Sequence, residues 1–316
     1  MFEPQIDGQG RLRHLITLAG LGGDRIRALL DTAETLRTTA DRAVNKLPLL
    51  RGRTVVNLFF EPSTRTRTSF ELAAKRLSAE LINFDIARSS TTKGETLLDT
   101  LRTLEAMRCD LFVVRHREVG TPEWLARNAG PGVALINAGD GNHAHPTQGL
   151  LDLFTIRRHR PDFSQLVVTI VGDIAHSRVA RSDIDGLRAL GVGELRLAGP
   201  PALLPEDAKA LGDRVFDRLD PALPGSDVII LLRLQKERMQ TALFGSDLEY
   251  AADWCLDSSR LAQARPDALV MHPGPINRGI EISDAVADGP QSLILEQVGN
   301  GVAVRMAVMA QLLGAA

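Results

Sequence analysis

Cysteine, aromatic residues and long apolar runs are all scarce in this chain of 316 residues. The two cysteines, Cys109 and Cys255, lie far apart in the sequence and match no metal-binding or redox spacing. That usage favours a reduced protein without disulfides, as is usual in the cytoplasm. No apolar run approaches the roughly 18 residues that a membrane-spanning helix requires, and the polar N-terminus has no apolar signal-peptide core. We therefore expect a cytoplasmic protein with no membrane partner.

An excess of either charge is also missing, since the formal net charge is -2. Such a balanced chain has no global field for nucleic acid, so we expect no nucleic-acid partner, and any anion binding must come from a few converging side chains. The sequence contains no cysteine and histidine cluster with metal-ligand spacing, no Walker motif and no dinucleotide fingerprint in the right context. We expect neither a metal nor a cofactor.

The length and the apolar content of 44% indicate two packed domains, because single cores seldom grow much past about 250 residues. Short apolar runs alternate with helical patterns, which is typical of α/β proteins with parallel sheets. We predict two doubly wound parallel-sheet domains joined by helices, with boundaries at 1–149 and 150–291 and a C-terminal helix within 292–316 that packs back on the first domain. Ligands of such sheets collect at the carboxyl ends of the strands, so we expect the active site in the interdomain cleft.

The predicted elements follow from these alternating patterns. Strands are expected at 54–60, 81–86, 111–114, 133–137, 166–171, 194–198, 214–216, 228–232 and 268–271. Helices are expected at 70–79, 95–108, 122–128, 146–159 and 292–313.

One polar turn, FFEPSTRTRT at 59–68, joins a predicted strand to a predicted helix and places Ser63 to Thr66 at the helix N-terminus. Free backbone N–H groups favour an anion there, and hydroxyls with an arginine fork add charge-assisted hydrogen bonds. The alternative is a Ser63 N-cap followed by two solvated arginines. Arg65 and Arg67 lie about 200° apart around the helix axis, so they cannot both face one ligand.

Further polar side chains follow other predicted strands of the first domain. Arg115 comes directly after the strand at 111–114, where the alternatives are a ligand-binding and a surface arginine. Pro146 suits the first position of a helix, and His145 and Gln148, three apart, share one side of its first turn. Together they can hydrogen-bond a carbonyl and an amide, although a capping or core histidine is the ordinary interpretation. Lys93 lies in a polar loop and is either a solvated lysine or part of a lid that brings a cation to a phosphate.

In the second domain, Arg233 and Gln235 follow a predicted strand and face the same side if the chain stays extended. An arginine with an amide suits a carboxylate, and the alternative is a charged loop in water. In the HPGP segment at 272–275, the prolines leave backbone carbonyls free to accept from an NH₂ group. A rigid turn after a strand is the alternative there.

Taken in order, these segments resemble the aspartate/ornithine carbamoyltransferase family, and within it the aspartate-specific branch. Each motif alone is weak, but the ordered set is specific and extends from about residue 54 to residue 308. The matching segments are FFEPSTRTR at 59–67, KGET at 93–96, NAGDG at 137–141, HPTQ at 145–148, RLQKER at 233–238, HPGPINRG at 272–279 and QVGNG at 297–301.

The resemblance implies a complete set of contacts for carbamoyl phosphate, which binds first. The phosphate would be held by Ser63, Thr64, Arg65, Thr66 and Arg115, with Ser89 and Lys93 added from a neighbouring subunit. The carbonyl oxygen would meet Thr66, Arg115 and His145, and the amino group would meet Gln148 and the backbone carbonyls of Pro273 and Gly274.

For the second substrate, the resemblance implies Arg178 on the α-carboxylate of aspartate, Arg233 and Gln235 on its side-chain carboxylate, and a contribution from Lys93. The α-amine would attack the carbamoyl carbon and expel phosphate, giving N-carbamoyl-L-aspartate for pyrimidine biosynthesis. The catalytic residues, which stabilise the developing charge, would be Arg65, Thr66, Arg115 and His145.

The family also implies a homotrimer with shared active sites, in which Glu61 pairs with Arg178 and Arg238 as the domains close. A regulatory chain or a dihydroorotase-like partner stays open. The chain departs from some relatives at Thr92, where they carry a second lysine, and at Gly274, where they carry leucine.

Two alternatives to an aspartate-specific enzyme are an ornithine or related amino-acid carbamoyltransferase and a non-catalytic structural or regulatory paralogue. Ornithine needs anionic partners, and that branch typically has a cysteine in an HCLP segment. This chain has HPGP at 272–275 and an Arg-x-Gln at 233–235, which favours aspartate. A competent residue at every carried-over position favours an active enzyme.

Overall fold

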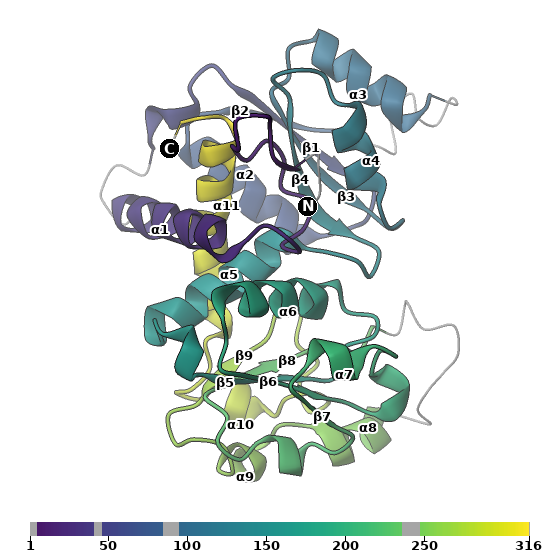
Figure 1. Ribbon diagram of the computed structural model, residues 1–316, viewed down its shortest axis with the longest axis vertical. Coiled ribbons are helices and arrows are strands. Elements are labelled where there is room, and N and C mark those ends of the chain that lie inside the picture. The colour runs from purple at the N-terminus through teal and green to yellow at the C-terminus, as the bar shows by residue number, and fades with distance from the viewer. Residues whose placement is uncertain (1–4, 41–45, 85–94, 236–246, 316) are drawn as a thin grey trace. The chain divides into compact units, whose positions relative to one another are not determined.

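The chain forms two compact units, each built on one parallel sheet (Figure 1). The computed structural model describes residues 5–40, 46–84, 95–235 and 247–315. The first unit is Met1–Leu150 with Asn300–Ala316, and the second is Leu151–Gly299. The predicted fold class, two α/β domains with parallel sheets, is confirmed. Among the helices of the described ranges, none is long and apolar enough to span a membrane.

The first unit contains a sheet of four strands in the order β2-β1-β3-β4, and every neighbouring pair is parallel. The order reverses between β1 and β3, so the loops that follow these two strands diverge at a topological switch point, where ligands of α/β sheets bind. The strands are β1 (Thr54–Phe59), β2 (Glu80–Asn83), β3 (Leu111–His116) and β4 (Ala134–Asp140).

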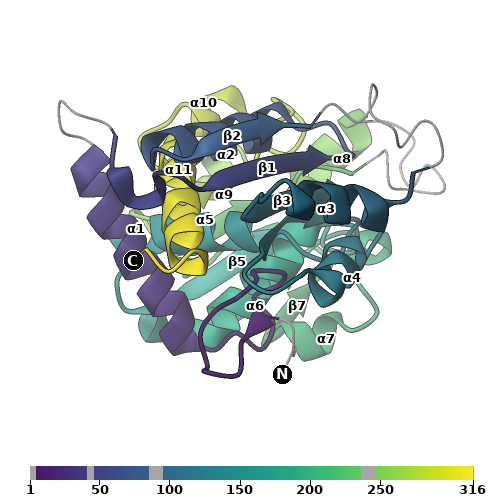
Figure 2. The same ribbon diagram turned by 90° about the horizontal axis from the view of Figure 1, so that it is seen from above.

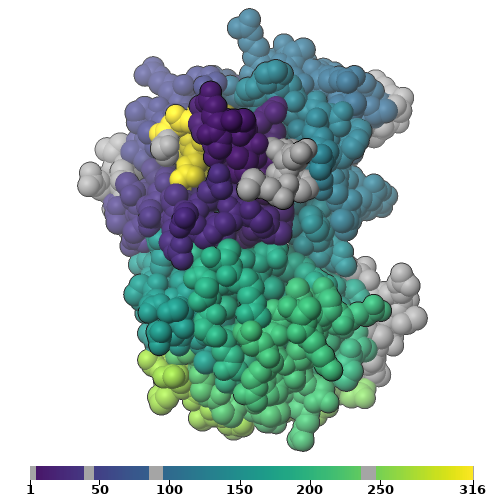
Figure 3. All heavy atoms as spheres, in the orientation of Figure 1, coloured from purple at the N-terminus to yellow at the C-terminus, as the bar shows by residue number. Residues whose placement is uncertain are grey.

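Helices flank this sheet. Buried apolar side chains of β1, β3 and β4 pack with those of α3 and α4. Gln311 Nε2 of α11 donates to Thr32 Oγ1 of α1 at 2.9 Å, and the two helices lie side by side in Figures 2 and 3. The helices are α1 (Gly23–Ala40), η2 (Pro48–Leu50), α2 (Thr64–Arg76), α3 (Leu97–Ala106), α4 (Thr121–Asn128), α5 (Pro146–His159), which continues into the second unit, and α11 (Ile294–Leu312), of which the residues from Asn300 belong here.

The second unit contains a sheet of five strands in the order β7-β6-β5-β8-β9, again with parallel pairs. Its order reverses between β5 and β8, which sets a second switch point. The strands are β5 (Val167–Val171), β6 (Glu194–Ala198), β7 (Arg214–Phe216), β8 (Val228–Leu231) and β9 (Leu269–Met271).

An apolar core on this second sheet includes Ile229 of β8 and Val270 of β9, together with Tyr250 and Trp254, whose ring centroids are stacked at 6.5 Å. The helices of the unit are η5 (Phe163–Gln165), α6 (Arg178–Leu190), η6 (Pro201–Leu203), α7 (Ala208–Leu211), η7 (Asp220–Ala222), α8 (Asp247–Trp254), α9 (Ser258–Leu261) and α10 (Asp284–Ala287).

All nine predicted strands correspond to strands β1 to β9. The prediction was too short for β3, which continues through Arg115 and His116. The pairing of β3 with β4 passes an irregularity after Val114 and resumes with His116 opposite Asp140. Arg115 is therefore part of the strand, opposite Phe59 of β1, and does not follow it as the sequence pattern suggested.

The segment around His14 extends the first sheet beyond β4. Leu15 N donates to Leu135 O at 2.9 Å, and Asn137 N donates to Leu15 O at 2.8 Å. The buried His14 ring accepts from Leu135 N through Nδ1 at 3.0 Å. Burial, with the neighbouring Arg13 charge, lowers the pKa of His14 to about 3. The ring is therefore neutral in the folded protein at physiological pH.

Protonation of His14 is expected to destabilise the protein in acid. A histidine whose folded-state pKa lies below its unfolded value of 6.5 contributes full stability above 6.5 and loses it as pH falls from 6.5 toward 3. His14→Asn keeps an acceptor for Leu135 N but does not titrate. Denaturant unfolding of both proteins across this range is expected to show a wild-type free energy that falls relative to His14→Asn by up to about 1.4 kcal/mol per pH unit. Parallel curves would contradict the assignment.

Candidate active site

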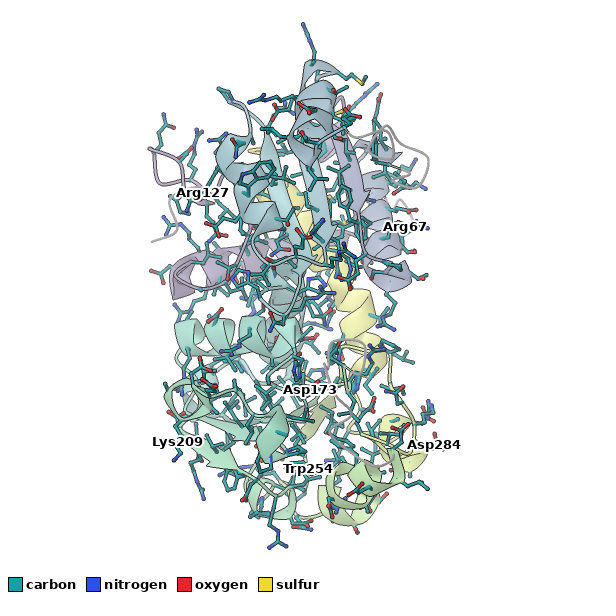
Figure 4. The ribbon with its side chains drawn as sticks, turned by 90° about the vertical axis from the view of Figure 1, so that its right-hand side faces the viewer. Arg67, Arg127, Asp173, Lys209, Trp254 and Asp284 are labelled. Atoms are coloured by element: carbon teal, nitrogen blue, oxygen red, sulfur yellow. The ribbon has the colours of Figure 1, made fainter. Side chains whose placement is uncertain are left out.

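The polar turn after β1 begins α2 as the sequence predicts. Ser63 is the N-cap residue of α2, but its side chain makes no capping hydrogen bond. Arg65 is exposed and Thr66 is buried. Arg67 projects from the outer side of α2 (Figure 4) and lies 3.5 Å from Glu71, one turn along the same helix. Both arginines of the turn are thus exposed, with Arg67 engaged by Glu71, and the N-cap hydroxyl does not occupy the first-turn N–H groups.

Arg115 at the end of β3 is anchored by two acceptors of the first unit. Its Nη2 lies 2.8 Å from Glu61 Oε1, and its Nη1 donates to Ala138 O at 3.1 Å. The Arg115 side chain is 10% exposed, so its charge is presented in one fixed direction. Glu61, which the resemblance assigns to domain closure, has Arg115 as a partner here. Sequence reasoning missed this pair, because the two residues are far apart along the chain.

His145 and Gln148 are both buried at the start of α5. Gln148 N donates to His145 O at 2.9 Å. The loop before them is organised by Asp140, a fully buried residue, which accepts from Ala144 N at 3.1 Å and from Gly120 N at 2.8 Å.

Asp140 is a residue that sequence reasoning missed as a contributor to the site, although it lies in the quoted NAGDG segment at 137–141. Burial raises its pKa, but hydrogen bonds from His143, Gly120 and Asn137 outweigh that effect and lower the pKa below its usual value. A charged Asp140 therefore holds the backbone that leads into His145.

In the second unit, Arg178 is the first residue of α6 and is buried. Ser177 caps this helix by accepting from Ala180 N at 3.2 Å. After β8, burial alternates along the chain as in an extended strand. Leu234 packs in the core, whereas Arg233 and Gln235 on either side of it are half-buried. Arg233 and Gln235 thus share the side opposite Leu234, in agreement with the alternation predicted from the sequence.

Asp173 joins the two loops that follow β5 and β8. It is fully buried (Figure 4). Asp173 Oδ1 accepts from His176 N at 3.2 Å and lies 2.8 Å from His176 Nδ1, and Oδ2 accepts from Gln235 N at 3.1 Å. One carboxylate therefore sets the loop that leads to Arg178 and the loop that carries Arg233. Sequence reasoning missed this role, for which Asp173 directly after a strand and a glycine was the available signal.

The turn after β9 is held by its own histidine. His272 Nδ1 accepts from Gly274 N at 2.8 Å, and His272 Nε2 lies 3.2 Å from Glu281 Oε1. The bond to Gly274 makes Nδ1 the acceptor, so Nε2 carries the proton. Gly274 has φ 67, a left-handed conformation that glycine adopts without strain and leucine does not. The peptide bond from Gly274 to Pro275 is cis.

The structure thus gathers the predicted residues of each unit at the carboxyl ends of its strands. Glu61, Ser63 to Thr66, Arg115, His145 and Gln148 lie in the first unit, and Arg178, Arg233, Gln235, Pro273 and Gly274 lie in the second. Ser89, Lys93 and Arg238 lie outside the described residues. The first set offers hydroxyls, N–H groups and arginines suited to a phosphate, and the second offers arginines and an amide suited to carboxylates.

Two parallel-sheet units, each with anion-binding side chains at the carboxyl ends of its strands, suit an enzyme that acts on small anionic substrates. The family model described as "Aspartate/ornithine carbamoyltransferase, carbamoyl-P binding domain" matches residues 13–158, and the model described as "Asp/Orn binding domain" of the same family matches residues 164–312.

Solved structures agree with these family models. Aspartate transcarbamoylase from Trypanosoma cruzi, in complex with carbamoyl aspartate and phosphate, is 32% identical, with a TM-score of 0.84 over 95% of this chain and 96% of that one. Ornithine carbamoyltransferase from Thermus thermophilus is 26% identical, with a TM-score of 0.83 over 95% and 99% of the two chains. The enzyme from Pyrococcus furiosus, also an ornithine carbamoyltransferase, is 27% identical, with a TM-score of 0.83 over 96% and 97%. The chain belongs to the aspartate/ornithine carbamoyltransferase family and is a carbamoyltransferase.

Asp173→Asn is expected to destabilise the second unit, because an asparagine turns one NH₂ group toward a backbone donor that Asp173 now satisfies. Leaving a buried donor unpaired costs roughly 1–3 kcal/mol, which denaturant unfolding measures. Asp207→Asn is the matched control, because Asp207 makes an exposed pair with Arg181, and we expect a change below about 0.5 kcal/mol. Equal effects of the two substitutions would contradict the role given to Asp173.

Proposed function

We propose that this carbamoyltransferase is specific for L-aspartate and forms N-carbamoyl-L-aspartate and phosphate, a step of pyrimidine biosynthesis. The observation that carries the proposal is the arrangement of the second unit, in which Asp173 holds the loops of Arg178 and of Arg233 and Gln235. These side chains are donors for carboxylates. Ornithine has a cationic side chain, which two arginines disfavour.

Carbamoyl phosphate is assigned to the first unit. Its phosphate binds the N-terminal turn of α2, where Ser63, Thr64, Arg65 and Thr66 add donors to the helix N–H groups. Arg115 supports this assignment, since its bonds to Glu61 and Ala138 aim its charge before any ligand arrives. A pre-aimed arginine loses little side-chain freedom on binding.

The carbamoyl group is assigned to groups with matching donors and acceptors. Thr66, Arg115 and His145 donate to its carbonyl oxygen. Gln148 and the carbonyls of Pro273 and Gly274 accept from its NH₂ group, which is consistent with the backbone held by His272. In this arrangement the carbamoyl carbon is polarised by donors on its oxygen.

The reaction then proceeds by direct attack. The α-amine of aspartate forms a bond to the carbamoyl carbon, the carbonyl electron pair moves to oxygen, and the bond to the phosphate oxygen breaks as the carbonyl re-forms. The amine proton is passed to the departing phosphate. Arg65, Arg115, Thr66 and His145 stabilise the oxyanion and the leaving group, and binding both substrates in line lowers the entropic barrier.

We further propose that the chain acts as a homotrimer in the cytoplasm, with Ser89 and Lys93 entering the site of a neighbouring subunit and Lys93 also reaching aspartate. Glu61 exchanges its bond with Arg115 for Arg178 and Arg238 when aspartate binds. A regulatory chain or a dihydroorotase-like partner is a further candidate for the assembly.

The specificity is tested with the purified protein, carbamoyl phosphate and either amino acid. We expect N-carbamoyl-L-aspartate and phosphate with aspartate, and no phosphate release above background with ornithine. Arg65→Ala is expected to lower kcat by roughly 10²–10³-fold, since it removes a donor to developing negative charge. The matched control is Arg67→Ala, because Arg67 pairs with Glu71 on the outside of α2, and it keeps near wild-type activity. Phosphate release with ornithine but not aspartate would overturn the assignment.

Shared sites are tested by mixing two inactive variants. Arg65→Ala and Lys93→Ala subunits, each inactive alone, are expected to recover part of the wild-type activity after dissociation and reassembly, because a mixed trimer contains sites with both residues intact. Subunit exchange is verified by native mass spectrometry. No recovery after confirmed exchange would show that Lys93 serves its own subunit.

A further inference from the structure

Asp183 on α6 is a buried acid that the proposed reaction does not use. It is 1% exposed, and neither of its carboxyl oxygens meets a hydrogen-bond donor within the part of the chain that the structure describes. An ionised carboxylate in this position would lack every hydrogen bond that its charge requires, at a large energetic cost. A neutral carboxylic acid avoids that cost.

A second buried acid, Asp152 on α5, interacts with Asp183 through its charge and a side-chain hydrogen bond. Burial, together with the charge of Asp152 and a side-chain hydrogen bond to it, raises the pKa of Asp183 well above its usual value. Two carboxylates in contact repel each other strongly, whereas an acid and a carboxylate form a short, charge-assisted hydrogen bond. The contact therefore requires one proton for the two groups.

The proton is placed on Asp183 because Asp152 has a donor of its own. Gln297 Nε2 of α11 donates to Asp152 Oδ1 at 2.6 Å, which is short for an amide donor and fits a charged acceptor. Asp152 is thus the carboxylate, which accepts from the amide of Gln297 and from the O–H of Asp183.

The polar chain continues from Gln297 into the turn of Pro273 and Gly274. Gln297 Oε1 accepts from His272 N at 3.0 Å, and His272 Nδ1 accepts from Gly274 N at 2.8 Å. The negative charge of Asp152 holds the NH₂ end of Gln297, so the oxygen end has to face His272. In this way the charge state of the acid pair decides how the backbone of the turn is held.

Asp152 is the charged group that acts on Asp183. Three arginines of α5 and α6 have ion-pair partners of their own: Arg158 pairs with Glu296, Arg181 with Asp207 and Arg188 with Asp213.

We propose that Asp183 and Asp152 share one proton at neutral pH and act, through Gln297, as a positioning pair for the turn that carries Pro273 and Gly274. The second half rests on the proposed function, which assigns the carbonyls of this turn to the NH₂ group of carbamoyl phosphate. The pair touches no substrate. Its effect is to hold acceptors in place before the ligand binds.

The shared proton is tested by infrared difference spectra of the full chain at neutral pH, wild type minus Asp183→Asn. We expect a protonated-carboxyl C=O band in the wild type that Asp183→Asn removes, since exposed aspartates are ionised at this pH. Asp207→Asn removes an exposed carboxylate and is expected to leave the band unchanged. A wild-type spectrum without a protonated-carboxyl band would overturn the proposal.

A protonated Asp183 also makes the free energy of unfolding depend on pH. Because the pKa of Asp183 is higher in the folded than in the unfolded protein, its contribution is fully present below the unfolded value of 3.8 and is lost as pH rises. Asp183→Asn donates an N–H to Asp152 and does not titrate. Its free energy of unfolding is therefore expected to increase relative to wild type from about pH 4 upward. Parallel pH curves would contradict a raised pKa.

The positioning role is tested by calorimetric binding of carbamoyl phosphate to two folded variants. Asp183→Asn retains a donor to Asp152, and we expect an affinity within about twofold of wild type. Asp183→Leu removes the donor, and we expect binding to weaken about tenfold, because Asp152 and Gln297 lose their fixed orientation. Unchanged affinity of Asp183→Leu would refute the positioning role. No binding to wild type would refute the proposed function instead, and the infrared result decides the shared proton in either case.

Discussion

Buried carboxylates that accept backbone N–H groups hold the polar ends of both sheets. Asp140 accepts from Gly120 and Ala144 in the first unit, and Asp173 accepts from His176 and Gln235 in the second. A buried charge requires such donors, and the loops at the carboxyl ends of parallel strands supply them. The loops therefore take one conformation, and the side chains they carry are placed with them. The architecture of the candidate site depends on this interaction.

Charge is used locally in this protein, as its small net charge requires. Arg115 is aimed by Glu61 and by a backbone carbonyl, whereas Arg67 is engaged on the surface by Glu71. The two arginines differ because Arg115 is buried at the carboxyl end of an inner strand, whereas Arg67 lies on the outer side of a helix. In the acid pair of Asp152 and Asp183, the proposed shared proton neutralises one carboxylate, as a cationic side chain would elsewhere.

Much of the fold was predictable, because the strands of parallel sheets are rich in apolar residues. Each of the nine predicted strands corresponds to a strand of the structure. Strand ends were less predictable. Arg115 was placed after β3 because a charge normally ends an apolar run, but pairing with β1 continues through it. The side of Gln235 was predictable from alternation around Leu234. Its anchor, Asp173, was not, because the two residues meet only after β5 and β8 pair.

The sequence by itself determined the class of fold, the ordered polar motifs at the strand ends and the difference between Arg65 and Arg67, because periodicity and spacing are local properties of the chain. Only the tertiary structure decided the partners: Glu61 for Arg115, Asp140 for the loop before His145, and Asp152 for Asp183. These contacts join residues that are far apart in the sequence and that strand pairing and helix packing bring together. Burial at those contacts then sets which groups stay charged, and burial is a property of the folded chain alone.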